Sequence, residues 1–157
     1  MGVRIPRSSR RGFTLIELLT VLLIIAILLA VAVPLLLRSR VAANEAAAIG
    51  AIRVLQGAAE QFRVENKRYG TLAEMNATNL LTGGLGTGNK SDYVFEVWVD
   101  PATWTAVFHA EGVPETYRST GMNSFYIDES GVIRFRDTGG NATVPRADAE
   151  LWSEIGD

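Results

Sequence analysis

The amino-acid sequence predicts an α+β fold in which one long N-terminal hydrophobic helix packs on a small antiparallel sheet of about four strands. Three features carry this prediction. Residues 13–37 form an almost uninterrupted apolar run, residues 38–67 continue it with helical spacing, and alternating strand patterns begin at Tyr93. The 157 residues suffice for one modest domain with an appendage.

The apolar run over residues 13–37 has the length and composition of a transmembrane helix. A span of about 20 apolar residues crosses the hydrocarbon core of a bilayer. This run contains a single charged residue, Glu17. Four arginines and no acid precede the run, whereas only Arg38 and Arg40 follow it closely, so the N-terminus is expected to stay in the cytoplasm.

A secretory signal peptide explains this start less well. Such a signal has an apolar region of about 7–15 residues, followed by a cleavage site of small residues. Here the matching pattern, Ala30-Val31-Ala32, lies deep inside the run, and cutting there would leave an apolar stub. A plain single-span anchor fits the length, but it needs neither the acid at Glu17 nor a glycine at the junction.

The segment Arg10 to Leu19, RRGFTLIELL, resembles the leader-cleavage motif of type IV pilins and type II secretion pseudopilins. The resemblance implies that a prepilin peptidase cuts between Gly12 and Phe13 and that Phe13 is then N-methylated. Glu17 matches the acid at the fifth position of the mature chain. Pro34 matches a proline that is common at the twenty-second.

The resemblance also implies three parts of the chain and a location for each. Residues 1–12 are a basic leader peptide that is removed, and residues 13–37 are the transmembrane and polymerisation half of the long helix. Residues 38–157 are a pilin-like globular domain on the periplasmic or extracellular side. The precursor is expected in a bacterial inner membrane, and the product in an extracellular filament or a periplasmic pseudopilus.

The charges at the start of the helix are expected to direct assembly. A carboxylate buried within a membrane costs roughly 2.5–3.5 kcal/mol on insertion scales. Cleavage would expose an α-ammonium on Phe13, and Glu17 of an axially staggered neighbour could pair with it. Thr14 is a weaker assembly candidate because its hydroxyl can bond locally in any helix. Pro34 lacks an N–H, so it should kink or loosen the helix.

The segment from Arg38 to Lys67 is predicted to extend the helix to about 50–55 residues in all, at a rise of 1.5 Å per residue. Its apolar residues recur mostly at steps of three or four and should form the seat for the sheet. They are Val41, Ala48, Ile49, Ile52, Leu55, Ala59 and Phe62.

Shorter elements are predicted after this helix. Thr71 and Glu74 fit a capping box that opens a short helix ending near Leu81. The glycine-rich residues 82–89 are interpreted as a flexible connection and not as a phosphate-binding loop, which would follow a strand. The predicted strands are Tyr93–Val99, Trp104–His109, Ser124–Asp128 and Val132–Arg136, with a loop over 111–121 and a turn at Gly131.

The C-terminal segment is predicted to be a loop over 137–145 and then a short helix over 147–155. Leu151, Trp152 and Ile155 should dock this helix on the domain. The absence of cysteine rules out the disulfide-bounded loop that many pilins carry at this end.

No catalytic, metal or cofactor site is predicted. His109 is the single histidine and is interpreted as an ordinary strand residue. Asp128, Glu129 and Asp137 were weighed as calcium ligands, but their spacing matches no known loop signature. Residues 13–157 sum to a formal charge of −6, which gives no reason to expect nucleic acid as a partner.

The sequence therefore predicts a structural subunit and not an enzyme. Its expected partners are copies of itself, the prepilin peptidase and methyltransferase, an inner-membrane assembly platform, and membrane lipid before assembly. A type IV pilus subunit is ranked first because the calcium signature is missing. A type II secretion pseudopilin comes second, and a membrane-anchored protein that forms no filament comes last.

Overall fold

The computed structural model describes residues 12–100, 102, 107–140, 146–149 and 151–155. The predicted leader, apart from Gly12, and half of the predicted strand Trp104–His109 (residues 104–106) lie outside these residues. By its contacts the chain divides into two units, Met1–Leu36 and Leu37–Asp157.

The long helix is confirmed as α1, Leu15–Asn66, with 52 residues. It ends where Lys67 takes the left-handed backbone conformation, with a φ of 59°, and donates its N–H to the carbonyl of Arg63 at 2.8 Å. The chain then passes close to the helix. A Cβ added to Gly70 would lie 2.7 Å from the ring of Phe62, so this position needs glycine.

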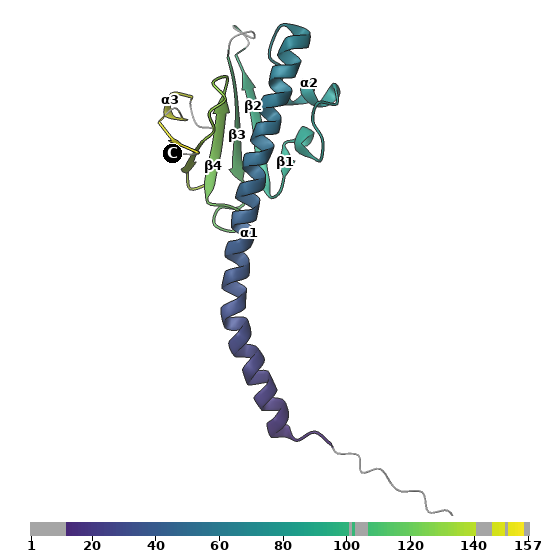
Figure 1. The fold of residues 1–157 in the computed structure, drawn as a ribbon, viewed down its shortest axis with the longest axis vertical. Coiled ribbons are helices and arrows are strands. Elements are labelled where there is room, and N and C mark those ends of the chain that lie inside the picture. The colour runs from purple at the N-terminus through teal and green to yellow at the C-terminus, as the bar shows by residue number, and fades with distance from the viewer. Residues whose placement is uncertain (1–11, 101, 103–106, 141–145, 150, 156–157) are drawn as a thin grey trace, which may run out of the picture. The chain divides into compact units, whose positions relative to one another are not determined.

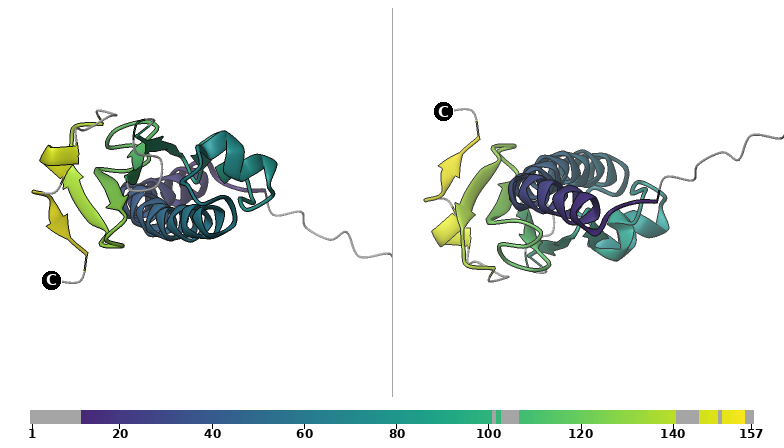
Figure 2. Two further views of the ribbon diagram at one scale, coloured as in Figure 1. Left: turned by 90° about the horizontal axis from the view of Figure 1, so that it is seen from above. Right: turned by 90° about the horizontal axis from the view of Figure 1, so that it is seen from below.

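Within the second unit, α1 lies along one face of the sheet (Figures 1 and 2). The predicted apolar stripe is confirmed, because its central members are buried there. The buried helix residues are Ala48, Ala51, Ile52, Leu55, Ala58, Ala59 and Phe62. Small alanines alternate with larger side chains in this set, which lets the helix backbone approach the strands closely.

The capping box is confirmed at α2, Leu72–Ala77, where Thr71 accepts the N–H of Glu74 and Glu74 accepts the N–H of Thr71. The helix is shorter than predicted, because Asn79 adopts a φ of 58° and ends it. The N–H of Leu80 donates to the carbonyl of Met75, as in a Schellman cap. The glycine-rich connection contains the short 3₁₀ helix η1, Leu85–Thr87.

The sheet has six antiparallel strands rather than four, in the order β1-β2-β3-β4-β5-β6. Each strand therefore pairs with its neighbour in sequence, as in a meander. Figure 1 shows α2 beside the β1 edge and α3 beside the opposite edge. The strands are β1 Asn89–Lys90, β2 Tyr93–Val99, β3 Phe108–Pro114, β4 Asn123–Asp128, β5 Arg134–Asp137 and β6 Ser153–Glu154.

Strand β3 lies later in the chain than predicted. Residues 111–114 were assigned to a loop, but Pro114 pairs with Tyr93 and the pairing runs along all of β2. The small Gly112 explains the error, because it looks like a strand breaker but leaves space for the ring of Phe95. A Cβ there would lie 2.6 Å from that ring.

The predicted helix over 147–155 is wrong for most of its length. Only α3, Arg146–Ala149, is helical, and β6 adds a strand to the edge of β5. Trp152 is buried beside the ring of Tyr126, as expected for a docking residue, and Ile155 packs against the core. Leu151 does not dock, because 84% of it is exposed.

Candidate functional site

The first turn of α1 brings together two of the predicted assembly residues, Thr14 and Glu17. Thr14 precedes the helix, and its hydroxyl accepts the backbone N–H of Glu17 at 3.2 Å. This is the geometry of a helix N-cap. The carboxylate of Glu17 belongs to the first turn, where the positive end of the helix dipole stabilises an anion. The local role of Thr14 is thus helix capping.

The peptide bond between Gly12 and Phe13 precedes the helix, and both residues are exposed. The side chain of Phe13 has 80% of its surface exposed. A Cβ added to Gly12 would meet nothing within 4 Å, so packing within the chain does not require glycine there. Any requirement for glycine must come from a partner that approaches this bond.

The apolar residues from Phe13 to Leu37 are exposed along the N-terminal part of the chain. Eighteen large hydrophobic side chains between Phe13 and Leu37 are each 45% to 80% exposed. Among the described residues, α1 is the one helix long and apolar enough to cross a membrane. An apolar surface of this extent requires lipid or other protein to cover it.

Pro34 lies inside α1, which continues through it. A proline has no N–H to donate, so the helix loses one hydrogen bond to the carbonyl of Ala30. The helix therefore lacks one hydrogen bond near the border between the two units.

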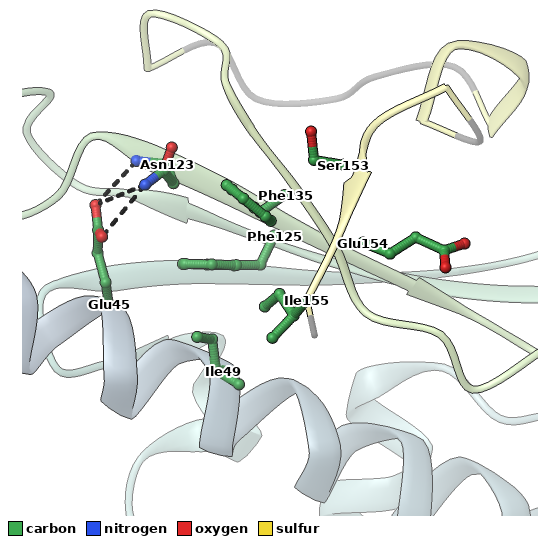
Figure 3. Close-up of a pocket in the computed structure, with 8 residues that line it drawn as sticks. All are labelled: Glu45, Ile49, Asn123, Phe125, Phe135, Ser153, Glu154 and Ile155. Carbon is green, nitrogen blue, oxygen red and sulfur yellow. Dashed lines mark hydrogen bonds between the residues drawn. The ribbon is translucent and has the colours of Figure 1, made fainter. Parts of the chain in front are cut away.

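Glu45 connects α1 to the loop before β4 in the second unit. Its Oε1 accepts the backbone N–H of Met122 at 2.9 Å and that of Asn123 at 3.1 Å. The side-chain amide of Asn123 also donates to it, as Figure 3 shows. One half-buried carboxylate thus accepts two backbone N–H groups from the segment that leads into β4.

Asp92 makes a second connection, between α1 and the turn that joins β1 to β2. Its Oδ2 accepts hydrogen bonds from Arg40 at 3.1 Å and from Asn44 at 3.2 Å. Ser91 and Asp92 both have positive φ values, 53° and 59°. Two such residues form the tight hairpin turn that favours asparagine and glycine, so the contacts from α1 hold a strained turn.

A groove of about 660 Å³ opens between α1 and the last strands (Figure 3). Its floor is apolar, with Ile49, Phe125 and Phe135, and Ile155 closes one side. Glu45 and Glu154 stand at its polar margins.

Comparison with known proteins adds an independent observation. Residues 7–33 match the family model described as the prokaryotic N-terminal methylation motif. The chain is 30% identical over 78 residues to competence protein ComGC of Streptococcus pneumoniae. The matched stretch covers 50% of this chain and 72% of that protein. The chain belongs to the type IV pilin and pseudopilin family.

Two further relatives are named type II secretion system core protein G. The Escherichia coli protein is 29% identical over 98 residues, which is 60% of this chain and 68% of the relative. The Klebsiella michiganensis protein is 35% identical over 65 residues, which is 41% of this chain and less than half, 46%, of the relative. Members of this family are structural subunits of pilin-like filaments, and an apolar N-terminal helix anchors their precursors in a membrane.

Two of the three candidate calcium ligands, Asp128 and Asp137, contact other groups of this pilin-family subunit. Asp128 accepts a hydrogen bond from Arg134 at 3.3 Å and one from the N–H of Ser130. The N–H of Gly139, and then the hydroxyl of Tyr117, hold the pKa of Asp137 below its usual value. Among the described residues, no three potential ligands gather at one place.

His109 lies in β3 and stacks between two aromatic rings, those of Trp98 at 5.1 Å and Tyr126 at 5.3 Å. This agrees with its interpretation as an ordinary strand residue. Sequence reasoning missed the contacts of Glu45 and Asp92. A possible signal was the polar side of α1, where Arg40, Asn44 and Glu45 interrupt a segment otherwise rich in alanine.

Proposed function

We propose that this subunit is cut between Gly12 and Phe13, is methylated on Phe13, and polymerises through α1 into a filament. The observation that carries the proposal is the exposed apolar surface from Phe13 to Leu37, which contains the single acid Glu17. In a filament the helices of neighbouring subunits would replace lipid as the cover for this surface.

The position of Glu17 supports pairing between subunits. At a rise of 1.5 Å per residue, Glu17 lies about 6 Å along the helix from Phe13. An axial stagger between neighbours would bring the carboxylate of one subunit to the α-ammonium of the next. Once both are buried, removing either partner typically costs about 3–5 kcal/mol, so the pair would select one register.

The proposal assigns a task to each part of the chain. Residues 1–12 keep the precursor N-terminus in the cytoplasm until cleavage, and residues 13–37 span the inner membrane and later line the filament axis. Residues 38–157 form the head on the far side of the membrane. The partners implied are further copies of the chain, the processing enzyme and an assembly platform in the inner membrane.

We favour a secretion-type pseudopilus over a surface pilus, which reverses the ranking made from sequence. The relative with the 98-residue match is named a type II secretion core protein. A match of that length extends beyond α1 into the head domain, so the likeness is not limited to the processing motif. The ComGC relative, whose length is covered more fully, keeps a competence or surface filament as the second candidate.

Replacement of Glu17 tests the proposal. Glu17→Gln is expected to be processed and inserted normally but to form few or no filaments, as counted by electron microscopy of sheared material. Glu65→Gln removes an exposed acid farther along α1 and serves as the matched control, with normal filament numbers. Mass spectrometry of the wild-type N-terminus should find methylated Phe13. An intact Met1 would refute the processing step.

A further inference from the structure

A second cavity, of about 520 Å³, opens where the globular unit begins. Residues 37–45 of α1 form one wall, and residues 118–122 of the loop before β4, together with Asn123 at the start of β4, form the other. Both walls belong to the second unit. Neither the processing step nor the helix-to-helix assembly proposed above uses this cavity.

The cavity combines two cationic side chains with apolar walls. Arg38 and Arg118 both line it, both are exposed, and neither forms a salt bridge within the described part of the chain. Leu37, Val41 and Met122 supply apolar surface. Guanidinium groups match the geometry of phosphate oxygens, whereas the apolar walls suit glycerol and the first acyl carbons.

One acid, Glu45, also lines this cavity. Its carboxylate already accepts the backbone N–H groups of Met122 and Asn123, so donors within the protein stabilise its charge. The two arginines therefore leave the cavity with an excess of positive charge. An anion is the complementary ligand.

The backbone of Arg118 is held in a conformation that arginine rarely adopts. Its φ is 64°, and its N–H donates to the carbonyl of Gly121 at 2.8 Å. Glycine or asparagine would occupy this position with less strain. Its guanidinium lies 5.2 Å from the centre of the Tyr117 ring, within the range of a cation–π contact. Strained residues of this kind concentrate at functional sites.

Position along the helix indicates which anion meets the cavity. Arg38 follows Leu15 by 23 residues, or about 35 Å at 1.5 Å per residue. The hydrocarbon core is about 30 Å thick, so an inserted α1 places Arg38 at the headgroups of the far leaflet. We propose that the cavity binds the headgroup of an anionic phospholipid and holds the unassembled subunit at a fixed depth. This step rests on the proposed membrane insertion.

The test uses the full chain in a neutral detergent, titrated with short-chain phosphatidylglycerol or phosphatidylcholine and followed by native mass spectrometry. The wild type should bind phosphatidylglycerol at least about tenfold more tightly than phosphatidylcholine. Each arginine near an anionic surface raises the binding constant by a factor of about five. Arg38→Gln and Arg118→Asn should each reduce that preference about fivefold. Arg53→Gln, an exposed arginine on α1 away from the cavity, should leave it unchanged.

Three results would overturn the inference. The first is equal affinity for the two lipids, and the second is an unchanged preference in both cavity variants. The third is displacement of phosphatidylglycerol by equimolar inorganic phosphate, which would indicate a site for a soluble anion. Both variants should fold. Arg118→Asn relieves backbone strain, so the unfolding temperature of this variant should not fall. Arg38→Gln changes a residue of α1 and leaves the loop intact. Alkaline carbonate extraction tests membrane insertion separately, so an inserted chain without lipid preference refutes this inference alone.

Discussion

The carboxylate of Glu45 on α1 accepts the backbone N–H of Asn123 at the start of β4, across 78 positions of the chain. This contact joins the helix to β4, an inner strand of the sheet. Glu45 belongs to the part of α1 that follows the apolar segment closely in sequence. Asp92 makes a second such contact, because its Oδ2 accepts a hydrogen bond from Arg40 on the same helix.

Loss of the Glu45 carboxylate should loosen the connection between helix and sheet. Glu45→Ala removes the carboxylate that accepts the N–H groups of Met122 and Asn123, and loss of these charge-assisted hydrogen bonds should cost about 1–3 kcal/mol of unfolding free energy. Hydrogen exchange at those two amides should accelerate by the corresponding factor. Glu65→Ala, at an exposed site on the same helix, should change stability by less than about 0.5 kcal/mol. Equal effects of the two replacements would refute this role.

In the strained turn between β1 and β2, substitutions at two neighbouring positions should change the stability of the protein in opposite directions. Ser91→Gly relieves a positive φ and should stabilise the protein by about 0.5–1 kcal/mol. Asp92→Ala loses the hydrogen bonds from Arg40 and Asn44 and should destabilise it by about 1–2 kcal/mol. Thermal unfolding of the full chain in detergent measures both. The explanation fails if both substitutions shift the unfolding temperature in the same direction.

Glu74 predicts a loss of stability in acid. The hydrogen bond from Arg68, followed by that from Thr71, lowers the pKa of Glu74 to about 2 from its ordinary value of 4.5. Because the folded pKa is the lower one, its contribution is complete above pH 4.5 and is lost as the pH falls towards 2. Glu74→Gln should flatten that part of the curve of unfolding free energy against pH. An unchanged acid slope in this variant would exclude Glu74 as its source.

Replacement by alanine should change the stability of the protein in opposite directions at two glycines, Gly50 in α1 and Gly70 beside it. Gly70→Ala places a Cβ 2.7 Å from the ring of Phe62 and should destabilise the head by about 1–3 kcal/mol through overpacking. A Cβ added to Gly50, which lies in α1, would meet nothing within 4 Å. Gly50→Ala should therefore stabilise the isolated subunit by about 1 kcal/mol, because alanine has the higher helix propensity. Denaturant unfolding of the two variants side by side gives the comparison. A stabilising Gly70→Ala would contradict the close approach of chain and helix.

Patterns in the sequence correctly predicted those elements that are determined by residues close together in the chain. The helix, the capping box at Thr71, the strand Tyr93–Val99 and the left-handed Gly131 all follow from neighbours within a few residues, and the structure contains each of them. The same holds for the buried stripe on α1.

The errors arose where distant residues decide the structure. Strand β3 extends through Gly112 because β2 pairs with it, and β6 exists because β5 offers an edge. The contacts of Glu45 and Asp92 join residues 48 to 78 positions apart, which no local pattern reveals. At the predicted processing site, Thr14 and Glu17 meet as helix neighbours, whereas pairing between subunits involves a second chain and stays a prediction.

The central claim is that Glu17 of one subunit pairs with the processed N-terminus of its neighbour. An image reconstruction of purified filaments measures this directly, as the distance from the Glu17 carboxylate to the nearest Phe13 nitrogen of another subunit. We predict a distance within about 4 Å, the limit for an ion pair. A reconstruction in which Glu17 faces solvent, or lies about 8 Å or more from every such nitrogen, beyond the range of direct pairing, would contradict the account.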